Sequence, residues 1–592
     1  MRHDATMPGG VTCLAVAALM AAALLAIVVR LREEQVNSAA LHGFEMGRQS
    51  ERLIQTAAAR GRILDRNGVV LAENRLVPVI AFDALACQKK TWNETARAIR
   101  EAIDGAASAI GRRSPVSDDD IRRHMKKALP RPMTVWRDVT PDEAARFFEH
   151  EKDLPGFVYL ASFERRYPLG SLAAHAIGYV GRDRAHGLPG GEKFDYADFE
   201  MRGRSGLEYY YDSYLRGVPG EKTVRVDARG FARGEETLVE PKKGLDLVTS
   251  LDVSIQAAVE RTLEGCKGAC VVLDPETGEV LAMASAPGYD LSSFVPVLGK
   301  DLYRRLSEDP ALPLLNRAVG GTYAPGSTFK PVTALAAISS GISPDFTFEC
   351  EGVFSLPGMS IRCTRTWGHG EMSLAEAMRE SCNPYFCRLG MDAGLDNVRE
   401  AAFALGLGSP SGVDFPVDAA GVVPDGDWKM KRYSTQWFPG DLAQMSIGQG
   451  MLLVTPLQMA RAVAAIGTGR LVVPVMRAGE RGASAGTGFS GEALDAVRAA
   501  MRKSVENGTG RKGAEGVDAY VIGKTGMAEV GSLSNRRKNA WFIAYAVSRG
   551  GDRSVALAIV VENGESGGST AAPKAGAILR SVFGTAKEAE NV

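Results

Sequence analysis

The sequence predicts an α+β multidomain protein with a single N-terminal transmembrane helix. The chain has 592 residues, which is too long for one hydrophobic core and suggests two to four domains. An uncharged apolar run from Val11 to Val29 is long enough to cross a bilayer as one helix. In the second half, strand patterns stand at both ends of a helix-rich stretch. This order predicts an antiparallel sheet with helices packed on both faces.

The apolar run is predicted to be an uncleaved anchor. Its A-x-A-like sites, such as Ala21-Ala22-Ala23, lie inside the run, and Arg30-Leu31-Arg32 follows directly, which argues against a cleaved signal peptide. Basic residues flank both ends, so the positive-inside rule gives no orientation. No second apolar run of that length follows, and we expect the rest of the chain to lie on one side of the membrane.

The composition gives no support for a nucleic-acid partner or a metal. Lys+Arg and Asp+Glu both number 70, so no net charge favours binding to nucleic acid. The seven histidines stand at no metal-ligand spacing with one another or with a cysteine. We therefore expect no metal and no cofactor.

The first domain combines a hairpin with a small helical lobe. Asn67-Gly68 between two apolar runs is a strong hairpin signal. Residues near 91–154 alternate helical patterns with charged loops, and Thr140 has the chemistry of a helix N-cap there. His175 lies between small and apolar residues and is predicted to be structural. A basic, glycine-bearing segment ending at Gly244 is typical of a linker, and the domain boundary is placed there.

The second domain is predicted to begin with a short strand and a helix and to contain two hairpins. Alternation and turn residues define the hairpins, one near the start of the domain and one near its end. The expected elements are Leu247-Val248, the helix Val253 to Leu263, the strands Ala269–Leu273 and Glu279–Ala284, and the strands Ala540–Val547 and Ser554–Val561.

A candidate nucleophile stands at the start of a predicted helix. Pro325-Gly326 interrupts the preceding segment, and apolar residues then recur at helical spacing, so the helix should begin close to Ser327. Pro331 is tolerated in a first turn. Ser327 and Lys330 then share one helix face, which brings the amine within reach of the hydroxyl. A partly desolvated lysine can act as the base that activates a serine, because burial lowers its pKa.

The S-x-x-K pattern alone is weak, because a helix N-cap followed by a solvated lysine would look the same. Two further motifs strengthen it. Ser381-Cys382-Asn383 follows a helical stretch, and Lys524-Thr525-Gly526 follows the short apolar strand Tyr520-Val521-Ile522. The three motifs together, in this order, are far less probable as an accident than any one of them.

In this order the motifs resemble those of penicillin-binding proteins and serine β-lactamases. The chain length and the anchor argue against a β-lactamase. Arg60 to Ala72, Arg166 to Gly181 and Gly206 to Gly217 are similar to the pedestal motifs of class B penicillin-binding proteins. Trp437 to Asp441 and Ser446 to Gly450 look more like the elongation-type enzyme, penicillin-binding protein 2, than the division type. Asn316-Arg317-Ala318 resembles the active-site entrance.

The resemblance implies a peptidoglycan D,D-transpeptidase that cross-links stem peptides during cell-wall elongation and is a target of β-lactams. A division- or sporulation-type transpeptidase is the alternative within the family. A membrane-anchored β-lactam sensor, or a non-catalytic cell-wall scaffold, is the alternative of another class. Intact motifs argue against a dead enzyme but leave the sensor open.

Each motif residue receives a role by resemblance. Ser327 would attack the carbonyl of the penultimate D-alanine of a stem peptide, and Lys330 would accept its proton. Ser381 would relay a proton to the departing D-alanine. Asn383 would hold the amide backbone of the substrate, although some elongation-type relatives carry Asp at this position.

The third motif would bind the end of the substrate. Lys524 and Thr525 would hold the terminal carboxylate, and the cation of Lys524 would help to keep Lys330 neutral. Gly526 would leave room for the substrate beside the strand. The backbone N–H groups of Ser327 and Met527 would form the oxyanion hole. Met527 stands where relatives usually have threonine, so a hydroxyl contact to substrate or β-lactam is lost.

The resemblance also implies an organisation and partners. The expected ranges are 1–10 as a cytoplasmic stub, 11–29 as the transmembrane anchor, 30–240 as the pedestal with its lobe near 91–154, 245–585 as the transpeptidase domain and 586–592 as a tail. The expected partners are stem peptides ending in D-Ala-D-Ala, β-lactams, a SEDS-type glycosyltransferase and membrane proteins of the elongation complex. The chain would be a single-pass protein of the inner membrane with its bulk in the periplasm.

The cysteines leave two possibilities open. The chain has eight, without a C-x-x-C pair. Cys350 and Cys363 could close a short loop as a disulfide if the domain is periplasmic. Free, buried thiols are equally compatible with the sequence.

Overall fold

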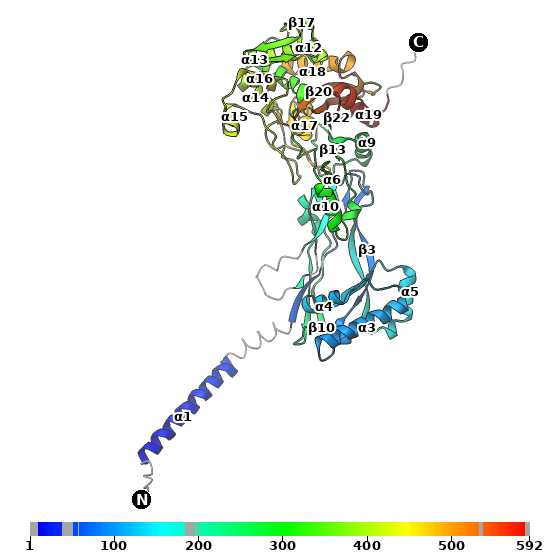
Figure 1. The fold of residues 1–592 in the computed structure, drawn as a ribbon, viewed down its shortest axis with the longest axis vertical. Coiled ribbons are helices and arrows are strands. Elements are labelled where there is room, and N and C mark those ends of the chain that lie inside the picture. Colours follow the sequence, from blue (N-terminus) through cyan, green and yellow to red (C-terminus); the bar gives the residue numbers. More distant parts are fainter. Residues whose placement is uncertain are drawn as a thin grey trace.

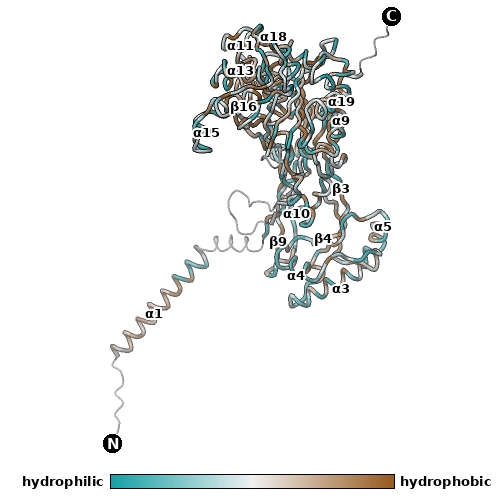
Figure 2. Tube along the Cα trace, turned by 45° about the horizontal axis from the view of Figure 1, so that its top comes forward, coloured by the Kyte–Doolittle hydropathy of each residue, from teal (hydrophilic) through white to brown (hydrophobic). Residues whose placement is uncertain are grey.

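The computed structural model describes residues 10–37, 51–56, 58–183, 196–197, 200–531 and 537–585. The predicted tail and nearly all of the predicted stub lie outside these ranges. The described part is elongated, with the C-terminal domain at one end (Figure 1). Helix α1 (Gly10–Arg32) carries the apolar run (Figure 2). Among the described residues it is the one helix long and apolar enough to cross a membrane, and none of its apolar window is buried.

The predicted N-terminal hairpin is present. Strands β2 (Ile63–Leu64) and β3 (Val70–Phe82) pair in antiparallel fashion around Gly68, which has a φ of +87°. The sheet continues from β3 to β4 (Met133–Arg137) and β5 (Phe157–Arg166). On its other side β11 (Leu247–Val248) pairs in parallel with β2. The first residues assigned to the second domain therefore complete the pedestal sheet.

The helical lobe has a core of its own. Helices α3 (Trp92–Ile110), α4 (Asp118–Lys127) and α5 (Pro141–Glu149) pack around buried residues that include Trp136. The hydroxyl of Thr140 accepts the N–H of the third residue of α5, as its sequence predicts. The other pedestal elements are β1 (Glu51–Thr56), α6 (Ala174–Ile177), β6 (Val180–Asp183), β7 (Tyr196–Ala197), β8 (Glu200–Gly203), α7 (Gly206–Tyr210), α8 (Asp212–Arg216), β9 (Gly220–Val226) and β10 (Ala232–Val239).

The C-terminal domain is built on a five-stranded sheet in the order β13-β12-β22-β21-β20. All neighbouring strands are antiparallel, and both predicted hairpins are present. The strands are β12 (Lys267–Leu273), β13 (Val280–Ala286), β20 (Ala519–Val530), β21 (Arg537–Ser548) and β22 (Ser554–Glu562). Strand β20 lies at the edge of this sheet, so one side of its backbone is free of strand partners.

Helices cover both faces of the sheet, which confirms the predicted fold class. Successive residues of β12 enter different cores: Val271 packs in the larger core and Val272 in the smaller one. Helices α9 (Val253–Leu263) and α19 (Ala572–Phe583) line the smaller core. The larger core contains α11 (Lys330–Ser339), α17 (Pro456–Thr468) and much of α18 (Gly491–Asn507).

Short helices and strand pairs surround this framework. The helices are α10 (Lys300–Glu308), α12 (Leu374–Glu380), α13 (Asn383–Ala393), α14 (Leu395–Ala404), α15 (Gly426–Tyr433) and α16 (Pro439–Ser446). The strand pairs are β14 (Phe348–Cys350) with β17 (Gly370–Met372), β15 (Val353–Leu356) with β16 (Met359–Arg362), and β18 (Arg470–Val472) with β19 (Ser484–Gly486).

The pedestal and the C-terminal domain share one hydrophobic core. Ile177 and Leu207 of the pedestal belong to the same buried cluster as Val271. His175 lies at this junction, where its Nε2 is 2.7 Å from the carbonyl oxygen of Pro313. Burial lowers the pKa of His175 to about 4, so it is neutral at physiological pH. The side chain packs at a buried junction, in agreement with its predicted structural role.

Candidate active site

Ser327 lies in a tight turn immediately before a helix. Residues Gly326–Phe329 form a 3-10 turn, and α11 continues from Lys330 with Pro331 in its first turn. The sequence predicted this helix start. Gly326 has a φ of +55°, and a Cβ there would stand 2.4 Å from the carbonyl oxygen of Met527. Only glycine permits this backbone contact between the turn and strand β20.

Buried polar groups hold the turn from behind. The indole N–H of Trp541 donates to the carbonyl of Ala324 at 3.0 Å. Arg317 is 1% exposed, and its Nε donates to Glu562 at 2.7 Å. The hydroxyl of Tyr323 donates to the same carboxylate at 2.8 Å. The resemblance places Arg317 at the active-site entrance. In the structure its buried guanidinium is neutralised by Glu562, and this ion pair supports the segment that leads to the turn.

The three sequence motifs meet at one hydroxyl. Lys330 Nζ contacts Ser381 Oγ at 3.2 Å, and Lys524 Nζ donates to the same oxygen at 3.0 Å. Lys330 Nζ also donates to the carbonyl of Ser381 at 2.6 Å and to Asn383 Oδ1 at 2.9 Å. Both lysines are fully buried.

The lysine amine is directed to the second motif. Within the described part of the chain, the hydroxyl of Ser327 makes no hydrogen bond. The sequence predicted that the amine of Lys330 would lie within reach of the hydroxyl of Ser327. In this structure the two groups form no hydrogen bond, because the amine donates to the carbonyl of Ser381 and to the side-chain oxygen of Asn383. The amide of Asn383 is itself fixed, since its Nδ2 donates to the carbonyl of Arg362 at 3.0 Å.

Burial depresses the pKa of both lysines. The pKa of Lys330 falls to about 8, with desolvation as the largest cause. The pKa of Lys524 falls well below its usual range, first through burial and then through the nearby charge of Lys330. Burial is therefore the first cause of the low pKa of Lys330, and the expected effect of Lys524 is a repulsion that the two buried amines share.

Ser381 has a strained backbone. It caps the C-terminus of α12 with a φ of +60° and a ψ of +40°, in the left-handed region. That conformation is uncommon for a residue other than glycine and is characteristic of functional sites. It lets the chain reverse between α12 and α13, so that the carbonyl, the hydroxyl of Ser381 and the amide of Asn383 all face Lys330.

The third motif lies inside strand β20. The sequence had predicted that the motif would follow the strand. Its residues pair in register with β21. Thr525 Oγ1 is 2.8 Å from Thr509 Oγ1. A Cβ on Gly526 would stand 2.7 Å from the carbonyl oxygen of Pro325 and 2.8 Å from Thr328 Cγ2. The structure therefore shows a need for glycine at position 526 in addition to the expected one, because the absent Cβ makes room for the turn that carries Ser327.

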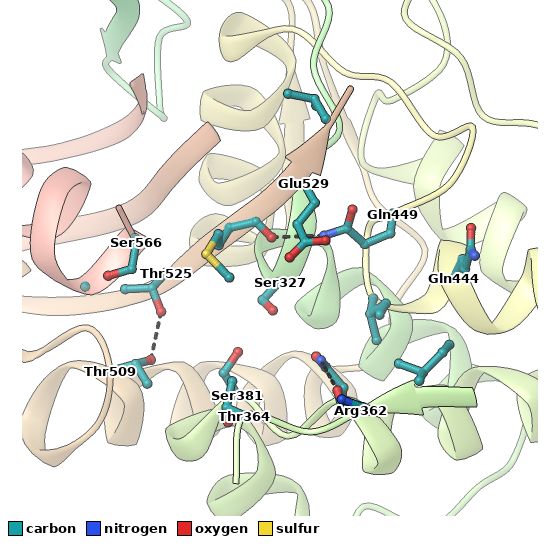
Figure 3. Close-up of a pocket in the computed structure, with 18 of the residues that line it drawn as sticks. Ser327, Arg362, Thr364, Ser381, Gln444, Gln449, Thr509, Thr525, Glu529 and Ser566 are labelled. Carbon is teal, nitrogen blue, oxygen red and sulfur yellow. Dashed lines mark hydrogen bonds between the residues drawn. The ribbon is translucent and has the colours of Figure 1, made fainter. Parts of the chain in front are cut away.

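Ser327 points into a cavity of about 1110 Å³. Strand β20 lies on one side and Ser381 on the other (Figure 3). Ser327, Ser381, Asn383, Thr525, Gly526 and Met527 line the cavity. The side chain of Gln449 donates to the carbonyl of Met527 at 3.0 Å, which steadies this part of the strand. Sequence reasoning missed several polar lining residues, namely Arg362, Thr364, Gln444, Thr509, Arg511, Lys512, Glu529, Ser566 and Ser569. They lie outside the three motifs.

The site has the parts that acyl transfer requires. The hydroxyl of Ser327 faces the cavity, and Lys330, whose pKa is lowered, stands nearby with the second hydroxyl, that of Ser381. The edge strand β20 offers backbone N–H and C=O groups to an extended peptide.

Four donor atoms converge beside the second motif. Cys350, Cys363, His369 and Cys382 each place one donor within 4.8 Å of the others. Cys363 Sγ lies 3.9 Å from Cys382 Sγ and 3.4 Å from His369 Nδ1. A tetrahedral zinc ion with bonds of about 2.3 Å to sulfur and 2.0–2.1 Å to nitrogen would separate its ligands by roughly 3.5–3.8 Å. These side chains therefore fit Zn²⁺.

The expectation of no metal was based on linear spacing alone, and the fold brings together four donor atoms that this spacing did not reveal. The donors come from the end of β14, from the segment between β16 and β17, and from the turn before α13, so linear spacing does not reveal them. All eight cysteines are free thiols. The alternative of free thiols therefore holds in this structure, and Cys350 and Cys363 are not bonded to each other.

Comparisons with known proteins agree with this architecture. A model of the penicillin-binding protein transpeptidase domain matches residues 268–580, and one of the penicillin-binding protein dimerisation domain matches residues 55–249. The peptidoglycan D,D-transpeptidase MrdA of Acinetobacter baumannii is 33% identical over 556 residues, which are 88% of this chain and 80% of that protein.

Two solved structures are similar over nearly the whole chain. Penicillin-binding protein PBP2 of Helicobacter pylori, in complex with MreC, has a TM-score of 0.76 at 27% identity, over 90% of this chain and 99% of that one. A chain from a peptidoglycan synthase complex, described for the coordination of polymerization and crosslinking, has a TM-score of 0.72 at 28% identity, over 98% of this chain and 100% of that one.

The chain belongs to the penicillin-binding protein transpeptidase family. Within the family it carries the dimerisation domain in front of the catalytic domain, and it is similar to MrdA and PBP2. The predicted family, its class B architecture and its transpeptidase activity are confirmed.

Proposed function

We propose that this chain cross-links peptidoglycan stem peptides during cell-wall elongation through an acyl-enzyme on Ser327. The observation that carries the proposal is the meeting of Lys330 and Lys524 at Ser381 Oγ, beside a serine that faces a large cavity. The similarity to a peptidoglycan D,D-transpeptidase over 88% of the chain supports the substrate and the reaction.

Proton transfer follows from the donor count of a neutral lysine. A neutral amine has two N–H groups and one lone pair. In Lys330 the two closest acceptors, the carbonyl of Ser381 and Asn383 Oδ1, take the N–H groups. The lone pair is then free to accept the proton of Ser327 or of Ser381. Lys524 donates to Ser381 Oγ, so Ser381 can pass a proton from the buried pair to the departing D-alanine.

The edge strand would bind the donor peptide. An extended stem peptide would add to the free side of β20, with its terminal carboxylate near Lys524 and Thr525. The N–H groups of Ser327 and Met527 would stabilise the developing oxyanion, and Asn383 would hold the peptide backbone. Attack by an amine of a neighbouring stem then transfers the acyl group and completes the cross-link.

We propose residues 30–240 as the pedestal domain and residues 245–585 as the transpeptidase domain. Helix α1 would anchor the chain in the inner membrane, with the catalytic domain in the periplasm. A SEDS-type glycosyltransferase would supply the glycan strands. The similar structures of a PBP2–MreC complex and of a peptidoglycan synthase complex support partners from the elongation machinery.

Fluorescent penicillin tests the nucleophile. The full chain in detergent should be labelled, and Ser327→Ala should not be, whereas Ser307→Ala on the exposed helix α10 should be labelled normally. Labelling of the Ser327→Ala protein would contradict the proposal. Polymerised lipid II with its glycosyltransferase separates a transpeptidase from a β-lactam sensor, because a sensor is acylated but produces no linked stems. Depletion should give rounded cells, and filaments would contradict the elongation role.

We also propose that Cys350, Cys363, His369 and Cys382 hold one structural Zn²⁺. The ion would tie the segment between β14 and β17 to the turn that carries Ser381 and Asn383. It would supply no chemistry to the reaction, because all four tetrahedral positions are taken by protein ligands. Elemental analysis should find about one zinc per chain, and His369→Ala should lower this content. A metal-free protein after purification in added zinc would contradict the site.

A further inference from the structure

The thiol-rich donor set has a second chemical capacity, which is disulfide formation. Cys363 Sγ and Cys382 Sγ are 3.9 Å apart, and both thiols are free. A disulfide needs the two sulfur atoms at about 2.05 Å. The sulfur atoms must therefore approach each other, and the backbone segments that carry them must follow in part.

One of these thiols is close to the cavity. Cys363 stands between Arg362 and Thr364, both of which line the cavity that Ser327 faces. Cys363 is 5% exposed, whereas Cys382 is fully buried. An oxidant that enters the cavity would thus meet Cys363 before Cys382, whose side chain has no exposed surface.

Both thiols are attached to residues of the active site. Cys382 is the middle residue of the second motif and is bonded to Ser381 and Asn383 through the backbone. The carbonyl of Arg362, next to Cys363, accepts the side-chain amide of Asn383 at 3.0 Å. Movement of Cys363 toward Cys382 would therefore act on the amide of Asn383 and on the hydroxyl of Ser381, which both contact Lys330.

We propose that Cys363 and Cys382 are a thiol–disulfide site that switches acylation off when the metal leaves. The inference rests on the acyl-enzyme and on the zinc site proposed above. With zinc bound, the sulfur lone pairs are engaged with the metal and the thiols resist oxidation. Without zinc, and in an oxidising compartment, the pair can react with a disulfide-containing oxidant.

The reaction balances with one molecule of oxidised glutathione. The thiolate of Cys363 attacks one sulfur of glutathione disulfide, which breaks that S–S bond, forms a mixed disulfide and releases one reduced glutathione. The thiolate of Cys382 then attacks Cys363 Sγ, forms the intramolecular S–S bond and releases the second glutathione. The protein pair loses two electrons, the oxidant gains them, and the two thiol protons end on the two glutathione thiols.

The test uses the full chain in detergent, in a zinc-loaded and a chelator-treated form. Each form is incubated with oxidised glutathione, and the acylation rate with fluorescent penicillin is measured. Peptide mass spectrometry identifies the bonded cysteines. We expect the chelated protein to gain a Cys363–Cys382 bond and to lose acylation by roughly 10- to 100-fold, the range for a displacement of about 1 Å at a reactive site. Dithiothreitol should restore the rate, and zinc-loaded protein should keep it.

Two variants make the test specific. Cys363→Asp keeps an oxygen ligand for zinc but cannot form the disulfide, so its rate with oxidant divided by its rate without oxidant should stay near one. Cys270→Ala removes a thiol buried in the other core, and it should respond to oxidant as the original chain does.

Several outcomes would overturn the inference. These are a chelated protein that keeps its thiols, a Cys363–Cys382 bond without loss of acylation, a Cys350–Cys363 bond in its place, or a Cys363→Asp protein that loses as much rate as the original. Absence of labelling in the reduced, zinc-loaded protein would instead refute the acyl-enzyme, and absence of zinc would refute the metal site. The three failures are therefore distinguishable.

Discussion

Lys330 Nζ and Lys524 Nζ lie 3.2 and 3.0 Å from the same oxygen atom, Ser381 Oγ. Two ammonium groups cannot share one buried hydroxyl without strong repulsion, so at most one of the pair carries a full charge in the resting site. The burial of both amines makes the neutral form of Lys330 accessible near neutral pH, which is the condition for its action as a base.

Acylation should therefore rise with pH and level off above the pKa of Lys330. The expected midpoint is about 8, because the amine must be unprotonated to accept a proton. The rate of labelling with fluorescent penicillin between pH 6 and pH 10, in roughly half-unit steps, measures this midpoint. In Lys524→Met we expect a slower reaction but a midpoint within about one pH unit of the original, since burial remains. If the midpoint of Lys524→Met instead lay near that of a solvated lysine, the charge of Lys524, and not burial, would be the main cause of the low pKa of Lys330.

Gly526→Ala should impair both folding stability and acylation. The added Cβ would stand 2.7 Å from the carbonyl oxygen of Pro325 and would displace the turn that carries Ser327. Overpacking of this kind costs about 1–3 kcal/mol in the free energy of unfolding. Thermal unfolding and the acylation rate measure the two effects.

Gly234→Ala is the matched control for this substitution, since Gly234 also lies in a strand and a Cβ there would meet nothing within 4 Å. If Gly526→Ala acylates as fast as Gly234→Ala, the close packing of turn and strand is not needed for the reaction.

Met527→Thr should increase the rate of acylation by β-lactams. Met527 lines the cavity, and a threonine would add a hydroxyl that can contact the ligand. One hydrogen bond contributes about 0.5–1.5 kcal/mol, which corresponds to an increase of roughly 2- to 10-fold. Met527→Leu has no hydroxyl and should stay close to the original. Equal rates for the threonine and leucine variants would exclude a contribution from this hydroxyl.

The junction between pedestal and catalytic domain should lose stability in mild acid. The pKa of His175 is lowered by burial from 6.5 to about 4 in the folded chain. Between these values the unfolded chain binds more protons, so stability falls as the pH drops from 6.5 to 4. The shift is worth roughly 3 kcal/mol.

Thermal unfolding at several pH values within this window measures the effect. His175→Asn removes the titrating group, and its Tm should depend less on pH than that of the original chain. The adjacent charge of Arg317 is retained in both proteins and cancels in the comparison. Parallel curves for the two proteins would show that His175 does not titrate with unfolding.

Local pattern was sufficient for most of the fold. Asn67-Gly68 predicted a hairpin because its backbone conformation suits a tight turn, and the helix Val253 to Leu263 was predicted with the bounds that the structure shows. The third motif was placed after a strand because the apolar run Tyr520-Val521-Ile522 ends before it, and glycine and lysine are themselves poor strand formers. In the structure, pairing with β21 overrides that preference and extends β20 through Gly526.

The site was less accessible to sequence reasoning where it depends on contacts across the chain. The motif spacing predicted that Ser327 and Lys330 belong together, but the acceptors of the amine, Ser381 and Asn383, follow only from the fold. The four donor atoms of the proposed zinc site were missed for the same reason. Strand pairing and a turn bring Cys350 and Cys382 together, and these contacts cannot be recognised from the spacing of the residues in the sequence.

The residue at position 381 must adopt a left-handed backbone conformation and must also present a small hydroxyl to both lysines. Serine meets both requirements. Glycine would relieve the backbone but would remove the hydroxyl that both lysines contact. A larger polar residue would keep a donor but would not fit between two buried amines. Stabilising this position and preserving its chemistry are therefore opposed, and a programme that evolves the protein for heat resistance should find that Ser381 cannot be exchanged without loss of activity.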